Sequence, residues 1–598
     1  MKKKLGEEIR QKRIGEVGTN SPNVFKPRAE DVDENDLDDI CKKHLIFSKV
    51  IRDSVHGDIW LTKLETEIID TPIFQRLRRI KQLGPTDLVY PSAKHTRFDH
   101  SIGALFVAQQ IIDSINKNFD NGLSYYKISS RDIITIRILA LIHDLAHLPY
   151  GHTIEDEGGL FNKKQWRDTE RFDYIWRIIQ QIIKSQLDNL PSIEREKIIQ
   201  DLNRGLKAEE GDKDNNIHEL ERPFIVDIVG NTICADLLDY LKRDAYNTGL
   251  KMVYDPRVLS YFVLVKQTKE IEEKTAKGIL EVKSIEGIRA AILLEKKEGK
   301  IKYDILNYCV DLLRMRYSLA EKSYFHRVKC IASAMVIKMI YCALEGKIIF
   351  NLVNAKSEEE KKFTLISLGD DSLIFTIMSY DNKDNQSDYT KTAKKLASKL
   401  FNRDLYKEIY SKNYTDESTY DSLVKFADKK ERYKKERELE DLCKLEPGSI
   451  VIYCPEKQSG KVAETKMLRY NKTGDKIVKT LKELSMEENY CSTIGQELTT
   501  IDNLYKRLWN FYILVDKKCI KDERHEQYLK KACLEFIEKN GISNDAVMLI
   551  DYILDGNLTQ KQIFDVASEL ALAKDAREVR DKIGFIDRKI LSFKGSGK

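Results

Sequence analysis

The sequence predicts a mainly α-helical fold with a small α+β lobe toward its C-terminus and a helical tail behind that lobe. Apolar residues recur at i, i+3 and i+4 through residues 65–83, 101–116 and 132–148, which is the spacing of helices with one buried face. Residues 449–454 have the pattern of a strand instead. Residues 516–598 return to helical spacing, so helix is the main expected element.

Changes in composition divide the 598 residues into four expected parts. Residues 1–44 are polar and irregular, which favours a tail or a partner-dependent arm. Pro447-Gly448 marks a later boundary, because both residues interrupt regular elements. The expected parts are a polar tail (1–44), a helical core (45–445), an α+β lobe (446–518) and a helical extension (519–598).

Local signals predict the remaining elements. His56-Gly57 predicts the turn of a hairpin over residues 51–61. Pro149 stops the third helix, and Gly249 ends a later one, because glycine readily adopts the left-handed conformation found after a helix. The other expected elements are a helical pair (303–344), a charged and mostly helical stretch (391–443), and strands at Ser449–Cys454 and Tyr512–Val515.

Charge and cysteine content limit the function classes. Lys plus Arg total 101 and Asp plus Glu total 96, so the net charge of +5 argues against a protein that binds polyanions over its whole surface. The 10 Cys include no CxxC pair, which indicates reduced thiols and a cytoplasmic location. No apolar run approaches the ~18 residues of a membrane-spanning helix, so we expect no membrane partner.

Five of the 10 His lie between His95 and His152, which is the strongest chemical signal in the sequence. Within that stretch His143 and Asp144 are adjacent near the end of an apolar helix. Neighbouring helix residues point about 100° apart, so both side chains reach one metal ion only from the cleft between them. A buried, ionised aspartate is costly unless it is paired or bound to metal.

His100 and Asp236 complete a set of two His and two carboxylates. This mixed nitrogen and oxygen set suits a divalent Mn, Fe, Mg or Zn ion better than a metal that prefers thiolates. The expected metal ligands are His100, His143, Asp144 and Asp236.

Four stretches carry a resemblance to a known family. In chain order they read VHGDIWLTKLETEIIDTPIFQRLRRIKQLG, HTRFDHSIGALFVA, LIHDLAHLPYGH and ICADLLDYLKRDAYNTG. Together they resemble the HD-domain deoxynucleoside triphosphate (dNTP) triphosphohydrolases, clearly over residues 46–345 and weakly over 446–520. The resemblance implies an HD-domain helical core, a divalent metal, and hydrolysis of a dNTP substrate to deoxynucleoside and triphosphate.

The resemblance also implies roles for single residues. His152 matches the catalytic His, with Glu155 as its acidic partner in place of the more usual Asp, and His147 is the alternative acid or base. The residues implied to bind substrate are Gln82 and Asp244 at the sugar 3′-OH, Arg97 and Arg316 at the phosphates, Tyr240 at the deoxyribose, and Tyr324 at the sugar or base.

A second nucleotide site is implied as well. Similar enzymes bind an activating guanine nucleotide, so GTP or a dNTP as activator and a homo-oligomer (dimer or tetramer) are expected. A carboxylate suits guanine because it accepts from both N1 and N2. Ordinary ion pairing between surface neighbours is the alternative interpretation. The implied positions are Lys49, Val50, Asp70, Gln75 and Arg78.

Two positions depart from the family pattern. Thr169-Glu170 stands where relatives have a His-Glu step, and Leu237 stands where they often have Lys. Both lost groups would touch phosphates, so an HD phosphohydrolase or phosphodiesterase acting on another nucleotide or an oligonucleotide is the alternative function. A non-enzymatic nucleotide or nucleic-acid binder is the third hypothesis, but it predicts broken metal ligands. Basic stretches at 391–399 and 429–437 fit solvated helix faces.

Overall fold

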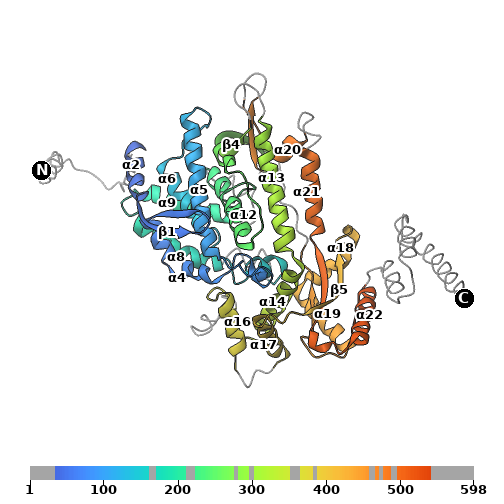
Figure 1. Ribbon diagram of the computed structural model, residues 1–598. Coiled ribbons are helices and arrows are strands. Elements are labelled where there is room, and N and C mark those ends of the chain that lie inside the picture. The colour runs from blue at the N-terminus through green and yellow to red at the C-terminus, as the bar shows by residue number, and fades with distance from the viewer. Residues whose placement is uncertain are drawn as a thin grey trace, which may run out of the picture.

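The fold is mainly helical with small sheets, as the sequence predicts (Figure 1). The computed structural model describes residues 34–160, 170–209, 222–274, 280–294, 302–350, 364–381, 387–456, 465–470, 476–486 and 494–540. Most of the expected tail and the larger part of the expected helical extension lie outside these residues.

The N-terminal region contains more regular structure than the sequence predicts. Helix α2 (Glu34–His44) lies within the stretch expected to be irregular. The amide of Ser130, at the start of a later helix, donates to Asp38 Oδ1 at 2.9 Å and so anchors α2 to the core. The hairpin prediction is confirmed by antiparallel strands β1 (Phe47–Asp53) and β2 (Gly57–Thr62).

The single helix predicted over residues 65–83 is wrong, because the chain breaks it after Ile69. Pro72 lacks an amide hydrogen and suits only a first helical turn, so a new helix begins there. The Thr71 side chain caps this helix by accepting from Phe74 N at 3.3 Å. The pieces are α3 (Lys63–Ile69), α4 (Pro72–Gln75) and the 3₁₀ turns η1 (Arg76–Arg79) and η2 (Gly84–Leu88).

Long helices form the centre of the molecule (Figure 1). They are α5 (Arg97–Asp120), α6 (Ser130–Ile142), α12 (Ala235–Thr248), α13 (Tyr303–Leu319) and α14 (Arg327–Glu345). Helix α6 ends well before the predicted end at Leu148, because the chain turns at His143. The predicted helix end at Gly249 is confirmed, and this glycine has the left-handed φ of 73°. The helical pair is confirmed by α13 and α14.

Shorter elements surround these helices. They are α8 (Glu170–Gln186), α9 (Ser192–Glu209), α11 (Phe224–Gly230), α16 (Asp370–Ser379), α17 (Asp388–Phe401), the π-helical turns η3 (Thr153–Glu157) and η5 (Ala320–Tyr324), and the 3₁₀ turn η4 (Pro256–Tyr261).

Two larger sheets join distant parts of the chain. One has the order β3-β4-β7-β8, with β4 and β7 parallel, and the sequence did not predict its strands. The other has the order β5-β9-β6 and confirms the strands predicted near residues 449–454 and 512–515. Its edge strand β5 lies in a stretch predicted to be mostly helical. The strands are β3 (Phe262–Lys274), β4 (Leu280–Leu293), β5 (Lys407–Asn413), β6 (Ile450–Tyr453), β7 (Lys466–Tyr470), β8 (Lys476–Thr480) and β9 (Asn510–Val515).

Buried apolar side chains form two large clusters. The first includes residues from Cys41 to Leu514 and contains the central helices. The second runs from Ile409 to Ile537 and packs helical residues 417–442 and 523–539 on the β5-β9-β6 sheet, whereas the buried residues of helices 481–485 and 496–507 belong to the first cluster. The C-terminal helices are α18 (Glu417–Leu423), η7 (Val424–Ala427), α19 (Lys429–Leu442), α20 (Leu481–Ser485), α21 (Gln496–Arg507), η9 (Lys517–Cys519) and α22 (Glu523–Lys539).

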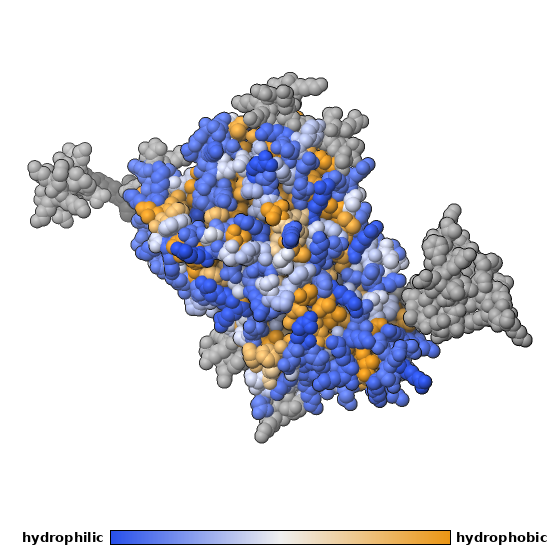
Figure 2. Space-filling view, viewed as in Figure 1, coloured by the Kyte–Doolittle hydropathy of each residue, from blue (hydrophilic) through white to orange (hydrophobic). Residues whose placement is uncertain are grey.

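The surface is mainly hydrophilic on the face seen in Figure 2, with hydrophobic residues scattered over it and the largest patch of them in its lower half. Among the described helices, none is both long enough and apolar enough to cross a membrane.

Candidate active site

Helix α5 begins with side chains that reach the site. The Thr96 hydroxyl accepts from Asp99 N at 3.4 Å, and Asp99 accepts from Thr96 N at 2.8 Å. A reciprocal cap of this kind fixes the first turn and is typically worth about 1 kcal/mol. Asp99 is therefore a capping residue, and its neighbours Arg97 and His100 are buried polar side chains of this turn.

The turn after α6 positions His143 at the helix end. The buried Arg76 guanidinium donates to the backbone oxygens of Leu145 and His147 at 3.1 and 2.7 Å. These bonds satisfy carbonyls that a helix end leaves without intrahelical partners. The segment that carries the His-Asp pair is therefore held against the N-terminal part of the core.

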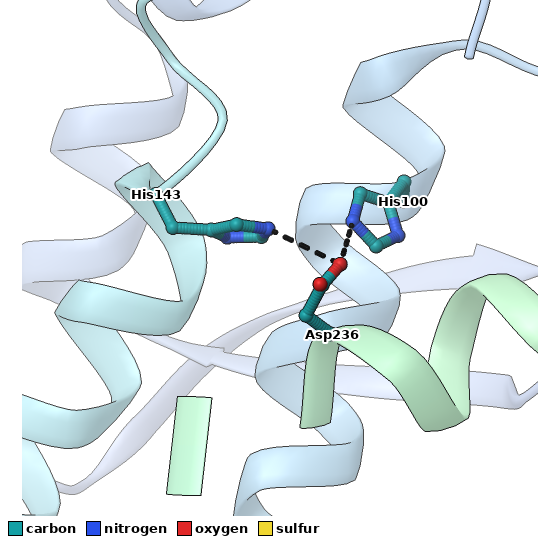
Figure 3. A group of neighbouring side chains, drawn as sticks. All are labelled: His100, His143 and Asp236. Carbon is teal, nitrogen blue, oxygen red and sulfur yellow. Dashed lines mark ion pairs between the residues drawn. The ribbon is translucent and has the colours of Figure 1, made fainter. Parts of the chain in front are cut away.

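His100, His143 and Asp236 bring candidate ligand atoms together from three segments (Figure 3). Asp236 Oδ1 lies 3.0 Å from His100 Nε2 and 3.7 Å from His143 Nε2. Two ligand atoms that are each about 2.1 Å from one ion lie ~3.0 Å apart at 90° and ~4.2 Å apart at 180°. The observed separations therefore suit one shared ion.

Backbone and carboxylate acceptors orient both imidazoles. His100 Nδ1 lies 2.7 Å from Asp239 Oδ2, and His143 Nδ1 lies 2.8 Å from the Ala140 carbonyl oxygen. A protonated Nδ1 donates in each case, so Nε2 is the nitrogen directed at Asp236. Metal-binding histidines commonly have this second hydrogen bond, because it fixes the tautomer and the ring orientation.

Asp144 lies beside these three atoms and is shared with Arg97. Its oxygens lie 3.7 Å from His100 Nε2 and 3.7 Å from His143 Nε2, and Arg97 Nη1 donates to Oδ2 at 2.6 Å. All four side chains expected to hold metal therefore meet at one place. The two nitrogens and the carboxylate oxygens form the donor set of a borderline or hard divalent ion.

The electrostatics of the site favour a cation. Burial disfavours the charged form of Asp144, but the Arg97 guanidinium and two neighbouring imidazoles hold the pKa of its carboxyl well below the usual value. Burial also disfavours protonated His100, yet Asp236 and Asp239 raise the pKa of this imidazole to about 10. Carboxylates that attract a proton this strongly also attract a divalent cation, which competes for the same nitrogen.

His147, His152 and Glu155 form a second group, whose ligand atoms lie within 4.8 Å of one another. The predicted pairing of Glu155 with His152 is wrong. Glu155 Oε2 lies 2.6 Å from His147 Nδ1, whereas His152 Nδ1 lies 2.7 Å from Asp156 Oδ2. Residues four apart on a helical turn share one face, which joins His152 to Asp156 and leaves Glu155 directed at His147.

The two histidines of this group differ in accessibility. His147 Nε2 lies 3.1 Å from Asp144 Oδ1, so carboxylates engage both of its nitrogens. The His147 side chain is only 14% exposed, whereas that of His152 is 59% exposed. His147 is therefore fixed between two acids, and His152 is the imidazole that a ligand can reach.

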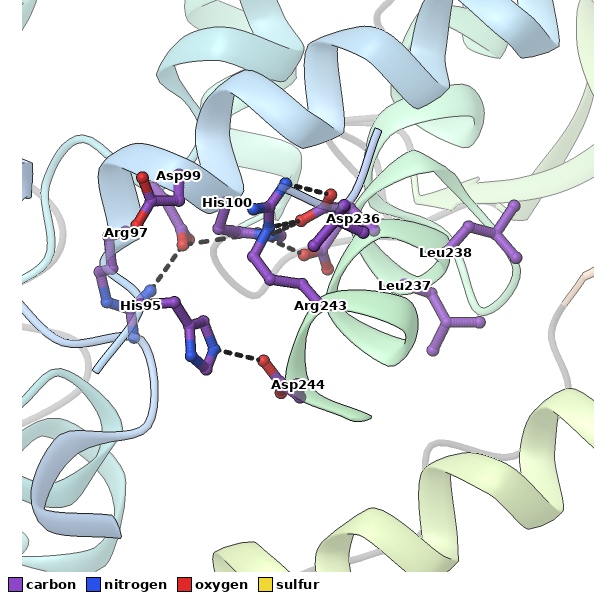
Figure 4. Close-up of polar contacts among 12 residues, drawn as sticks. His95, Arg97, Asp99, His100, Asp236, Leu237, Leu238, Arg243 and Asp244 are labelled. Carbon is purple, nitrogen blue, oxygen red and sulfur yellow. Dashed lines mark hydrogen bonds and ion pairs between the residues drawn. The ribbon is translucent and has the colours of Figure 1, made fainter. Parts of the chain in front are cut away.

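A chain of contacts joins three of the predicted substrate residues. Gln82 N donates to the His95 carbonyl at 3.0 Å, and His95 Nε2 lies 2.8 Å from Asp244 Oδ1 (Figure 4). The Tyr324 hydroxyl donates to the other Asp244 oxygen at 2.6 Å. His95 was not among the predicted site residues, although its place in the histidine-rich stretch was a usable signal.

Several polar groups near the cluster lack partners. Nε and Nη2 of Arg97 and Oε1 of Gln82 are buried without a hydrogen-bond partner among the described residues. Arg316 makes no ion pair with a described carboxylate. Burial disfavours its charged form, yet Tyr240, Tyr505 and Asp236 lie close enough to raise the pKa of its guanidinium. Buried polar groups are rarely left unsatisfied, so the Arg97 donors indicate a place for an anionic group and the Gln82 acceptor indicates a place for a hydroxyl or other donor.

The five positions predicted for an activating nucleotide are near the surface. Lys49 Nζ lies 3.5 Å from Asp70 Oδ2, and both side chains are at least half exposed. Arg78 Nε donates to Gln75 Oε1 at 2.9 Å, and Val50 on β1 is exposed. This arrangement fits either an accessible nucleotide site or ordinary surface pairing.

The two departures from the family pattern have different outcomes. Leu237 is 2% exposed and lies in the first apolar cluster, and Figure 4 shows it directed away from His100. It therefore offers no contact to a phosphate beside the metal ligands. Thr169 and the side chain of Glu170 lie outside the described residues.

A buried network behind His100 was missed by the sequence interpretation. Asp239 accepts from Arg243 Nη2 at 2.9 Å, and His56 Nε2 lies 2.6 Å from Asp239 Oδ1. Arg243 also donates to Asp53 at the end of β1 at 2.8 Å. The available signal was the helical spacing along α12. Asp239 follows Asp236 by three residues and Arg243 follows Asp239 by four, so each pair are neighbours on the helix surface.

Comparison with known proteins agrees with this geometry. Residues 97–229 match the HD domain family. The chain carries an HD domain. The matched residues contain three of the four expected ligands, and Asp236 lies shortly after them.

Relatives with similar sequences cover about half of the chain. An uncharacterised protein of Methanocaldococcus jannaschii is 33% identical over 50% of this chain and 51% of its own length. The deoxynucleoside triphosphate triphosphohydrolase SAMHD1 of Danio rerio is 28% identical over 48% of this chain and 44% of its own. The SAMHD1 homolog of Dictyostelium discoideum is 34% identical over 40% of this chain and 43% of its own length. The chain thus spans about half the length of these relatives or less.

Proposed function

We propose that the chain is a metal-dependent phosphohydrolase that cleaves a dNTP into deoxynucleoside and triphosphate. The convergence of two imidazoles and two carboxylates from α5, the end of α6 and α12 is the observation that carries the proposal. A divalent ion bound there would lower the pKa of a water ligand and polarise a phosphoryl oxygen. The named relatives support the choice of a dNTP as substrate.

The chain's own residues supply the remaining chemistry. Arg97 has two unpaired nitrogens with which to hold a phosphate oxygen, and its third is fixed by Asp144. His152 is oriented by Asp156 and is accessible, and an imidazole can act as a general acid or base, so we assign it the proton transfer to the leaving group. His147 keeps Asp144 and Glu155 in place.

Helix α12 can align a nucleotide along one face. Asp236, Tyr240 and Asp244 follow one another at intervals of four residues, so they lie on one side of the helix, about 6 Å apart along its axis. The metal ligand, the ring for the deoxyribose and the carboxylate for the 3′-OH are thus in a row. Arg316 on α13 lies near Tyr240, where it can bind the terminal phosphates.

Product analysis tests the proposal. The full chain is incubated with each dNTP and with Mn²⁺, Mg²⁺, Fe²⁺ or Zn²⁺, and products are separated by ion-exchange chromatography. Equal amounts of deoxynucleoside and triphosphate are expected. Deoxynucleoside monophosphate with pyrophosphate would contradict the cleavage position, and no product with any dNTP and metal would refute the activity.

One observation favours the alternative, an HD hydrolase that acts on another nucleotide or an oligonucleotide. Leu237 offers no phosphate contact where similar enzymes have Lys, so the triphosphate would be held by fewer cations. The same reaction series with cyclic and linear oligonucleotides separates the two functions. Cleavage of oligonucleotides alone would select the alternative.

Regulation by a guanine nucleotide is part of the proposal. The exposed pair of Lys49 and Asp70 supports it, because an accessible carboxylate can accept from guanine N1 and N2. GTP should accelerate dNTP hydrolysis and increase oligomer size in light scattering, and Asp70→Ala should lose both effects. Asp120→Ala, which removes another exposed Lys–Asp pair, is the matched control.

A further inference from the structure

Helix α21 of the C-terminal region lies alongside α13, which carries Arg316 (Figure 1). Arg314 Nη2 on α13 pairs with Glu497 Oε1 at the start of α21 at 2.6 Å. Nearer the other end of α21, the rings of Tyr505 and Tyr317 meet edge to face, with centroids 5.4 Å apart. The face of α21 that carries Tyr505 therefore packs on the helix of the predicted phosphate ligand.

The hydroxyl of Tyr505 is buried and has no hydrogen-bond partner among the described residues. Its surroundings are polar, because the Arg316 guanidinium and the hydroxyls of Tyr240 and Tyr324 lie within electrostatic reach. The buried Tyr324 hydroxyl donates to Asp244, whereas the Tyr505 hydroxyl has no such acceptor among the described residues. A buried polar group without a partner typically costs about 1–3 kcal/mol, which a ligand acceptor would offset.

The chemistry of this pair selects the ligand. Arg316 and Tyr505 are both donors, and no described carboxylate is within ion-pair distance of Arg316. A guanidinium and a phenol hydroxyl within electrostatic reach of each other suit an anionic oxygen that accepts from both. A phosphate oxygen at the end of a nucleoside triphosphate has this property, and an uncharged base edge does not.

We propose that Tyr505 is a substrate-binding residue supplied by the C-terminal region, donating to the terminal phosphates that Arg316 holds. The assignment of these phosphates to a dNTP rests on the proposed function. The inference that this place binds an anion rests only on the Arg316 and Tyr505 side chains and on their burial. Helix α21 thus forms part of the nucleotide site, which joins the C-terminal region to the HD domain in one binding unit.

Tyr505→Phe is the direct test, because it removes one oxygen and keeps the ring against Tyr317. A hydrogen bond to a charged group is worth roughly a 10-fold or larger change in binding. We expect KM for the dNTP to rise by about that factor while kcat stays within about 2-fold. Tyr410→Phe is the control, since its hydroxyl is also buried without a described partner but lies in the second apolar cluster.

Calorimetric binding of inorganic tripolyphosphate separates this inference from the proposed function, because it needs no turnover. Weaker binding by Tyr505→Phe than by the wild type or Tyr410→Phe supports the inference even if no dNTP is hydrolysed. Equal binding by all three proteins would overturn it, and so would absence of tripolyphosphate binding by the wild type. Hydrolysis of dNTPs with an unchanged KM in Tyr505→Phe would leave the proposed function standing and overturn the inference.

Discussion

Nδ1 of His100 lies 2.7 Å from Oδ2 of Asp239, so a buried carboxylate decides which nitrogen of this candidate ligand is directed at Asp236. Asp239 is itself held by Arg243 and by His56 in the turn of the N-terminal hairpin. The geometry of the site thus depends on a residue that touches no ion or substrate.

Asp239→Asn should weaken metal binding about 10- to 100-fold, because the amide is a poorer acceptor and no longer raises the basicity of His100. Equilibrium dialysis against Mn²⁺ measures the effect. Asp227→Asn is a suitable control, since Asp227 is an equally buried carboxylate that pairs with Arg289 away from the cluster. Unchanged affinity in Asp239→Asn would show that His100 needs no such partner.

Gly151→Ala should disturb Arg97. A Cβ at Gly151 would lie 2.4 Å from Arg97 Nη2, and the residue has a φ of +44°. Gly122→Ala is the matched control, because Gly122 also has a positive φ but a Cβ added there meets nothing within 4 Å. Both variants should lose about 1–2 kcal/mol of stability from the left-handed conformation.

Only the Gly151 variant should lose activity, by about 10²-fold, since a small displacement of a phosphate ligand is costly in catalysis. Thermal unfolding and steady-state kinetics on both proteins distinguish the effects. Equal activity in the two variants would mean that Arg97 does not act on the substrate in this position.

His152→Gln should reduce kcat about 10²- to 10⁴-fold, the usual contribution of a general acid or base, with metal content unchanged. Asp156→Asn should reduce it less, because the imidazole remains but is less well oriented. Glu155→Gln should instead reduce metal affinity through His147 and Asp144. If Glu155→Gln and not Asp156→Asn reproduced the His152→Gln pH profile, His147 would be the proton donor.

Metal affinity should rise with pH. Asp236 and Asp239 raise the pKa of His100 to about 10 despite burial, so below that pH the imidazole holds a proton that a cation must displace from Nε2. Release of one proton predicts about a 10-fold gain in affinity per pH unit between about pH 6 and about pH 9. Calorimetry in buffers of different ionisation enthalpy counts the protons released. No release would contradict ligation by His100.

The sequence predicts those features that depend on local spacing. The end of α12 at Gly249, the hairpin around His56 and the clustering of metal ligands follow from turn chemistry and residue type. The break at Pro72 was also readable from the sequence, but apolar periodicity obscured it. The β3–β4 hairpin was missed because its charged residues give no clear alternation of apolar and polar side chains.

Tertiary contacts set the limits of prediction at the site. Glu155 is three residues from His152, yet it bonds to His147 because the π-helical turn rotates it away. Asp239 acts through His100, which is distant in the chain. Tyr505 comes from a region with only weak family resemblance, so no motif indicated it. Such partners are determined by packing between elements.

The metal content of the full chain tests the central claim most directly. Asp236→Ala suits this purpose because the Asp236 side chain is 35% exposed, so its truncation leaves no buried cation unpaired, whereas loss of Asp144 would strand Arg97. Elemental analysis after dialysis against Mn²⁺ should find about one ion per wild-type chain and far less in the variant, with unchanged circular dichroism. Equal metal content in both proteins would contradict a metal centre built on His100, His143, Asp144 and Asp236.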